Sequence, residues 1–275
     1  MPNYTAADIK ALRERSGAGM LDVKKALDDA DGDADKAMEI LRVKGLKGVT
    51  KREGRSASMG LVAGQVDGGI GTLVEVNCET DFVAKNDQFI SLADKVLAAA
   101  VDSGVTETEK LLQVQVDGKT VADLVTDAAA TMGEKIEVRR VGRLEGEDVS
   151  LYLHKTNPDV PPQIGVLLAT SADSGSLGHD VALHVAAMNP TYLIRDEVPE
   201  ETVAHERRIA EQTAREEGKP EQALPKIIEG RMNGFFKENV LMDQAFAKDP
   251  KKSIAQVAQE AGGQITGLVR FRVGA

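Results

Sequence analysis

The order strand, strand, helix occurs twice in this sequence, and this repetition constrains the fold more than any other feature. In the first copy, two apolar runs over residues 61–67 and 71–78 flank a Gly68-Gly69 turn. Runs of this length on either side of paired glycines predict a β-hairpin. Apolar residues spaced three and four positions apart over 87–101 then predict an amphipathic helix.

The second copy repeats this plan in the other half of the chain. Residues 149–154 and 163–169 predict another hairpin, and an Ala-rich helix over 177–188 follows it. We interpret the two copies as related α+β subdomains with antiparallel sheets. Further predicted elements are helices over 121–132 and 253–261, and strands over 136–144 and 265–273.

The N-terminal segment has the periodicity of three short helices over residues 5–45. Thr5 and Asp8 have the spacing of a reciprocal helix cap, and Gly45 is a typical residue for the end of the third helix. Residues 44–58 carry five Lys or Arg side chains and three glycines, which favours a mobile basic linker after the bundle.

Residues 198–240 consist largely of polar helix formers, interrupted at Gly218-Lys219-Pro220. This pattern predicts an antiparallel helical hairpin inserted into the second subdomain. The predicted division is a helical bundle over 1–45, a basic linker over 46–58, a first core subdomain over 59–145, a second core subdomain over 146–197 and 241–275, and the hairpin over 198–240.

Charge and cysteine content limit the partners and the compartment of the chain. The formal net charge is −10, from 34 Lys plus Arg against 44 Asp plus Glu, which disfavours direct binding along a nucleic-acid backbone. The one cysteine, Cys78, cannot form an internal disulfide. The N-terminus lacks the apolar segment of a signal peptide, and the longest apolar runs are too short to cross a bilayer. We expect a soluble cytoplasmic protein without a membrane partner.

Motifs of the familiar enzyme classes are missing from the sequence. It contains no G-x-x-x-x-G-K-[ST] phosphate loop, no H-E-x-x-H zinc motif and no G-x-S-x-G nucleophile motif. One cysteine also excludes zinc sites built from several cysteines. We therefore expect no cofactor and no metal site, although an enzyme with an unfamiliar active site stays an alternative.

The segment Thr80-Asp81-Phe82-Val83 has two interpretations. In the first, a strand ends here, Asp81 turns the chain and Phe82 lies in the core. In the second, Phe82 is an exposed aromatic beside a carboxylate at a loop tip. Such a pair can insert into a partner, because buried aromatic anchors dominate many interfaces.

Two other local features also allow two interpretations each. Met20 and Leu21 follow a turn over 16–19 that contains two glycines, so they belong either to a tight helix connection or to an adaptable apolar contact. His184 lies on an Ala-rich helix, where it is either a hydrogen-bonded packing residue or an acid or base with a partner in reach.

Five segments closely resemble the bacterial elongation factor Ts family. They are LRERSGAGMLDVKKAL (12–27), VEVNCETDFVAKND (74–87), HVAAMNPTYL (184–193), IIEGRM (227–232) and ITGLVRFRVG (265–274). The likeness runs in order from about residue 4 to the C-terminus. It implies a small ubiquitin-associated-like (UBA-like) bundle, two repeated core subdomains and a coiled-coil-like helical hairpin.

Members of this family catalyse guanine-nucleotide exchange on elongation factor Tu and carry out no covalent chemistry. The resemblance therefore implies that this chain binds the GDP-bound and nucleotide-free forms of elongation factor Tu. It also implies that Thr80, Asp81, Phe82 and Val83 lie beside the partner's nucleotide site, where Asp81 and Phe82 help to displace the Mg²⁺ that bridges protein and GDP.

Other contacts implied by the resemblance lie on the bundle and on the second subdomain. The bundle is expected to dock on the GTPase domain of the partner around Leu12, Met20 and Leu21, and His184 is expected to approach the same domain. Many family members continue after the final strand with a helical module, which this sequence is expected to lack because it stops at Ala275. The alternative function is a non-catalytic adaptor that binds through the bundle and the hairpin, and self-association through the hairpin stays open.

Overall fold

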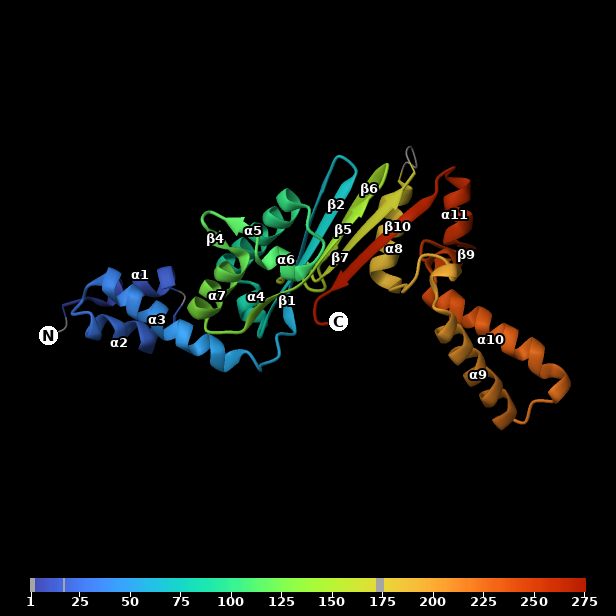
Figure 1. Ribbon diagram of the computed structural model, residues 1–275, viewed down its shortest axis with the longest axis horizontal. Helices are drawn as coiled ribbons and strands as arrows, with labels where there is room; N and C mark the ends of the chain where they lie inside the picture. Colours follow the sequence, from blue (N-terminus) through green and yellow to red (C-terminus); the bar gives the residue numbers. More distant parts are fainter. Residues whose placement is uncertain (1–2, 17, 172–175) are drawn as a thin grey trace.

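The computed structural model describes residues 3–16, 18–171 and 176–275. Figure 1 shows a helical bundle at one end, two sheets with their covering helices in the middle, and a pair of long helices at the other end. The mixture of helices and antiparallel sheets confirms the predicted α+β class. No helix within these ranges combines the length and the apolar character needed to cross a membrane.

The first sheet contains β1 (Met59–Asp67), β2 (Ile70–Cys78) and β5 (Ile136–Glu145), in the order β1-β2-β5. Both pairings are antiparallel, which confirms the predicted hairpin. Two helices, α5 (Asp87–Ser103) and α7 (Val121–Met132), pack against this sheet. The apolar face of α5 buries Phe89 and Val96 against the sheet.

The second sheet repeats the arrangement of the first. It contains β6 (Asp148–His154), β7 (Ile164–Thr170) and β10 (Ile265–Arg272), in the antiparallel order β10-β7-β6. The helix α8 (Leu177–Met188) covers it. In each sheet the second strand is central, and the third strand follows after intervening helices, so the predicted strand, strand, helix order is confirmed in both halves.

The two sheets stack face to face, and this contact was not predicted. Side chains from both sheets form one buried cluster, which includes Val62, Leu73, Leu167 and Phe271. The stacking is close, because a Cβ at Gly71 would lie 2.6 Å from a methyl carbon of Leu167. The central strand β2 is therefore buried on both faces, between its helices and the opposite sheet.

The N-terminal helices α1 (Ala6–Ser16), α2 (Met20–Asp29) and α3 (Ala34–Arg52) enclose a small apolar core of their own. Thr5 and Asp8 exchange hydrogen bonds of 2.7 and 3.3 Å at the start of α1, as predicted.

The predicted end of the third helix at Gly45 was wrong, because α3 continues to Arg52. Residues 46–52 are therefore part of this helix, and a linker begins only after Arg52. A Cβ at Gly45 would lie 2.3 Å from the Ala130 carbonyl oxygen, so this glycine allows α3 to lie directly against α7. Arg52 also donates a hydrogen bond of 3.1 Å to the Ala129 carbonyl. Packing against α7 therefore stabilises the last turns of α3, which contain the weak helix formers Gly45 and Gly48.

The long helices α9 (Glu200–Glu216) and α10 (Leu224–Asn239) lie side by side and project from the second sheet (Figure 1). An ion pair of 2.8 Å joins Glu217 to Arg231 across them. The remaining elements are α4 (Asp81–Ala84), α6 (Thr108–Leu112), α11 (Ile254–Glu260), the 3-10 turns Arg195–Glu197, Glu221–Ala223 and Leu241–Asp243, and two short ribbons, β3 (Gln115–Val116) with β4 (Lys119–Thr120) and β8 (Ala245–Phe246) with β9 (Asp249–Ser253).

Candidate functional site

The segment after β2 folds into the one-turn helix α4, so the interpretation as a simple strand end was wrong. Thr80 precedes the helix in an extended conformation and accepts a hydrogen bond of 3.4 Å from the Val83 amide. This is the position and the bond of an N-cap. The Phe82 side chain is 81% exposed, which also excludes the interpretation that it lies in the core.

The helical geometry of α4 explains why one aromatic residue points outward. Successive residues of a helix are about 100° apart around its axis, which follows from 3.6 residues per turn. Ala84 is fully buried and Val83 is half-buried, and both pack on the core beneath the first sheet. Phe82 therefore faces away from that core, whereas Asp81 is partly exposed at its side.

The carboxylate beside Phe82, that of Asp81, is paired with a cation. Lys85 lies one turn farther along, and its Nζ donates a hydrogen bond of 2.9 Å to Oδ2 of Asp81. This bond from Lys85 holds the pKa of the Asp81 carboxyl below its ordinary value. The tip of α4 thus presents an exposed ring next to an ionised carboxylate.

A second carboxylate fixes the start of α4 to a distant part of the chain. Oε2 of Glu134 accepts hydrogen bonds from the backbone amides of Glu79 and Thr80, both at 3.0 Å. Its Oε1 accepts a third bond of 2.6 Å from the Thr80 hydroxyl. In return, Oε1 of Glu79 accepts a bond of 2.6 Å from the Lys135 amide. The segments 79–80 and 134–135 are therefore joined in both directions.

The thiol nearest to this site is not set up as a nucleophile. Cys78 is fully buried, and its Sγ lies 3.2 Å from the Thr80 carbonyl oxygen. Burial raises the pKa of the Cys78 thiol to about 12. Reactive cysteines have lowered pKa values, so Cys78 contributes packing at this site and no covalent chemistry.

The bundle carries a second exposed apolar tip. Met20 and Leu21, the first two residues of α2, are 59% and 84% exposed. Ala18 and Gly19 lead into this helix, whereas Gly17 of the same turn lies outside the described residues. Leu12 is only 2% exposed and belongs to the bundle core, so in this conformation it packs beneath the surface on which docking was expected.

His184 was also expected to contact a partner, but it is fully buried. Its Nδ1 accepts a hydrogen bond of 3.1 Å from the Ala247 amide, which places the ring proton on Nε2. Nε2 then donates to Oε1 of Gln244 at 2.9 Å. Burial lowers the pKa of His184, because the charged form would lose solvation. The packing interpretation of His184 is therefore confirmed, and a direct contact in this conformation is excluded.

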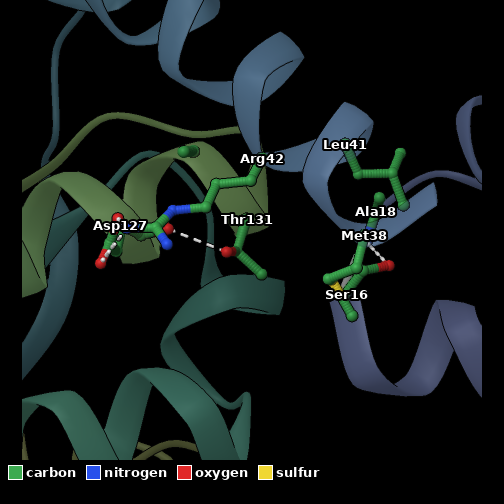
Figure 2. Close-up of a pocket in the computed structure, with 8 residues that line it drawn as sticks. Ser16, Ala18, Met38, Leu41, Arg42, Asp127 and Thr131 are labelled. Carbon is green, nitrogen blue, oxygen red and sulfur yellow. Dashed lines mark hydrogen bonds and ion pairs between the residues drawn. The ribbon is translucent and has the colours of Figure 1, made fainter. Parts of the chain in front are cut away.

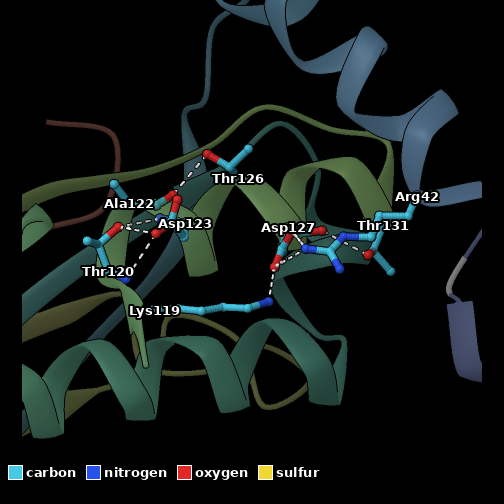
Figure 3. A network of polar contacts seen from close by, with 8 residues as sticks. All are labelled: Arg42, Lys119, Thr120, Ala122, Asp123, Thr126, Asp127 and Thr131. Carbon is cyan, nitrogen blue, oxygen red and sulfur yellow. Dashed lines mark hydrogen bonds and ion pairs between the residues drawn. The ribbon is translucent and has the colours of Figure 1, made fainter. Parts of the chain in front are cut away.

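One helix, α7, connects the bundle to the first sheet. Asp127 on α7 pairs with Arg42 of α3 at 2.9 Å and with Lys119 of β4 at 2.5 Å. Figure 3 shows these two cations meeting at the same carboxylate, with Thr120 capping the start of α7 nearby. The bundle is thus held to α7 by charge as well as by the close approach at Gly45.

A recess of about 220 Å³ lies at this junction, between Met38 of the bundle and Thr131 of α7 (Figure 2). Its two charged lining residues, Arg42 and Asp127, already neutralise each other. No group of three or more His, Cys, Asp or Glu side chains among the described residues is arranged to hold a metal ion. The exposed tip of α4 is therefore the more distinctive candidate site.

Comparison with known proteins identifies the family. The family model described as "Elongation factor TS" matches residues 79–275. The elongation factor Ts proteins of Micrococcus luteus and Beutenbergia cavernae are each 64% identical to this chain, and that of Kineococcus radiotolerans is 58% identical. Each alignment covers the whole of both chains. The chain belongs to the elongation factor Ts family.

In this member of the elongation factor Ts family, the structure brings together only part of the predicted residue set. Thr80, Asp81, Phe82 and Val83 share one turn, of which Phe82 is the most exposed. The sequence analysis missed Glu134, which lies 54 positions from Thr80 along the chain. A lone glutamate between a helix and a strand carries no signal that separates it from an ordinary surface carboxylate.

Proposed function

We propose that this chain is a guanine-nucleotide exchange factor for elongation factor Tu, and that it carries out no covalent reaction itself. The observation that supports this proposal most strongly is the 81% exposed Phe82 on a turn fixed to the rest of the fold. An exposed aromatic on a fixed turn can act as an interface anchor, because its large apolar area is removed from water when it enters a partner's pocket. Membership of the elongation factor Ts family supplies the identity of that partner.

The proposed mechanism needs only a difference in affinity. A factor accelerates nucleotide release when it binds the nucleotide-free partner more tightly than the GDP-bound partner. By linkage, GDP must weaken binding of the factor to the same extent. A 10³-fold effect corresponds to about 4 kcal/mol at about 1.4 kcal/mol per factor of ten. One inserted aromatic hot spot contributes about 2–4 kcal/mol, so Phe82 with a few polar neighbours is sufficient.

In this mechanism, Phe82 enters the partner beside its nucleotide site, with Asp81 at the rim and Thr80 and Val83 shaping the turn. Bound Mg²⁺ and oriented backbone amides neutralise the phosphates of a nucleoside diphosphate such as GDP. An inserted ring displaces groups that hold this metal, so both Mg²⁺ and GDP are released more readily and GTP can load. The metal belongs to the partner throughout.

The other parts of the molecule are assigned binding roles. The bundle over 1–45, as a UBA-like unit, docks on the GTPase domain through Met20 and Leu21, and the two core subdomains over 59–145 and over 146–197 with 241–275 hold the α4 tip. The hairpin over 198–240 provides a surface for partner contact or self-association. We place this activity in the cytoplasm, with no nucleic acid or membrane partner.

The test is the rate at which a fluorescent GDP analogue leaves elongation factor Tu, with and without this chain, at fixed Mg²⁺. The proposal predicts that substoichiometric amounts of this chain greatly accelerate release of the GDP analogue. The exposed pair Met20 and Leu21 also suits an adaptor that docks without exchange. Complex formation with an unchanged release rate would support the adaptor and overturn the exchange function.

A further inference from the structure

The helix α4 is too short to hold its own orientation. It has four residues, from Asp81 to Ala84. Isolated helices of fewer than about 12 residues are marginal in water, because one turn fixes many dihedral angles for few hydrogen bonds. The direction in which Phe82 projects must therefore be set by contacts from outside the helix.

The strongest such contacts come from Glu134. Its carboxylate accepts three hydrogen bonds from the residues that immediately precede α4. The Thr80 hydroxyl donates its single proton to Glu134, so an oxygen lone pair is left to accept the Val83 amide. The carboxylate thus fixes the backbone before α4 and also orients the hydroxyl that caps it.

We propose that Glu134 is the positioning residue of the exchange site: it acts through α4 by holding Phe82 in the direction that enters the partner. This inference rests on the exchange function proposed above. Both oxygens of Glu134 are engaged by Glu79 and Thr80, so the proposed role requires no contact between Glu134 and the partner. Its effect on nucleotide release is therefore transmitted through Phe82.

The place of Glu134 in the chain gives this role a wider reach. It follows Gly133, which ends α7 in the left-handed conformation at φ 76°. The same helix carries Asp127 and Ala130, which hold the bundle. Both exposed tips, Phe82 on α4 and Met20 with Leu21 on α2, are therefore positioned relative to α7.

The experiment measures GDP release from elongation factor Tu over a range of concentrations of the full-length chain. Each titration gives a maximal rate at saturation and a concentration for half-maximal effect. The variants are Glu134→Ala, Phe82→Ala and the double variant, with Glu134→Gln as the conservative replacement. Glu145→Ala is the matched control, because Glu145 lies on the adjoining strand β5 and pairs with Arg143 instead.

We expect Glu134→Ala to lower the maximal rate at least fivefold and to change the half-maximal concentration less than threefold. Glu134→Gln should keep at least half of the maximal rate, because its amide oxygen can still accept both backbone amides. In the double variant, Glu134→Ala should add less than a twofold loss to that of Phe82→Ala, since residues that act as one unit do not add. The Glu145→Ala control should match the wild type.

A merely structural role gives a different pattern. Partial unfolding removes active molecules, so it raises the half-maximal concentration and leaves the maximal rate unchanged. That pattern, or fully multiplicative losses in the double variant, would overturn the proposal. If Glu134→Ala does not fold, Glu134→Asp is read by the same criteria, because its side chain is one methylene shorter and cannot keep all three bonds to Glu79 and Thr80. Failure of the wild type to accelerate release would instead contradict the exchange function itself.

Discussion

The two sheet-and-helix halves share one topology but use their distinctive residues in opposite ways. In the first half, the connection from β2 to the covering helix α5 contains α4, which exposes Phe82. In the second half, the covering helix α8 turns His184 inward, where both ring nitrogens have partners. The comparison teaches that a repeated fold does not repeat a site. What matters is whether the residue lies on a separately anchored turn or on the buried face of a helix.

The largest effect on stability is expected from His184→Ala. This change leaves the side-chain oxygen Oε1 of Gln244 and the backbone amide of Ala247 without their buried partner. It also opens a cavity beside the apolar core of the second half. We expect a loss of about 2–4 kcal/mol in the free energy of unfolding, measured by urea denaturation. His205→Ala, at an exposed position on α9, should change it by less than about 0.5 kcal/mol. A loss at His184 that is no larger than that control would contradict its role in the core.

The exposed tip of the bundle should affect binding and leave stability unchanged. Replacing Met20 and Leu21 together by serine removes about 1–3 kcal/mol of apolar contact in the complex, which is about tenfold or more in the half-maximal concentration. The maximal rate of GDP release should stay within twofold. Val43→Ser is the matched control, because Val43 is an exposed apolar residue on α3 of the same bundle. Equal effects of the two changes would remove any special role of this tip.

His184 also predicts a pH dependence that begins near pH 6.5, above the range in which carboxyl groups such as Asp81 of the first half titrate. Its pKa is lowered in the folded protein from the ordinary value of 6.5, so the unfolded chain binds the proton more readily. The stability that depends on neutral His184 is present above about pH 6.5 and is lost as the pH falls through the folded-state pKa. Urea denaturation at pH 7.5 and at lower pH should show a shallower decline for His184→Gln than for the wild type. Parallel declines would contradict this assignment.

The smallest effect is expected at the junction between the bundle and α7. Asp127→Asn weakens two partly exposed ion pairs, with Arg42 and Lys119. Pairs of this kind contribute about 0–1 kcal/mol, so the unfolding free energy should change by no more than that. The close approach at Gly45 is expected to keep the bundle in place. Detachment of the bundle in Asp127→Asn, detected by rapid proteolysis after Arg52, would show that charge dominates this junction.

Much of the fold could be predicted because local patterns and tertiary packing agree. Both hairpins, the helices α5, α7 and α8 and the strand β10 follow directly from periodicity and turn residues. The continuation of α3 to Arg52 could not be predicted, since it depends on contact between Gly45 and the distant Ala130. The stacking of the two sheets was hidden for the same reason. A strand pattern shows that two faces are apolar without showing what covers each face.

The candidate site was only partly predictable. The resemblance drew attention to residues 80–83, but the residues alone did not decide whether Phe82 was buried or exposed. That outcome depends on tertiary contacts of the α4 turn: Ala84 packs on the core, and Thr80 is bonded to Glu134, 54 positions away along the chain. Leu12 and His184 also lie in segments that resemble the family, but both are buried in cores and not exposed as Phe82 is. A conspicuous residue in a matching segment can therefore be structural, and burial separates the two cases.

The most direct test of this account is the maximal rate of GDP release from elongation factor Tu with Phe82→Ala at saturating concentration. Phe82 is 81% exposed, so its removal should change the unfolding free energy by less than about 0.5 kcal/mol. We predict a maximal rate at least tenfold below that of the wild-type chain, which corresponds to about 1.4 kcal/mol or more. A folded Phe82→Ala variant that releases GDP at the wild-type rate would contradict the claim that the α4 tip drives exchange.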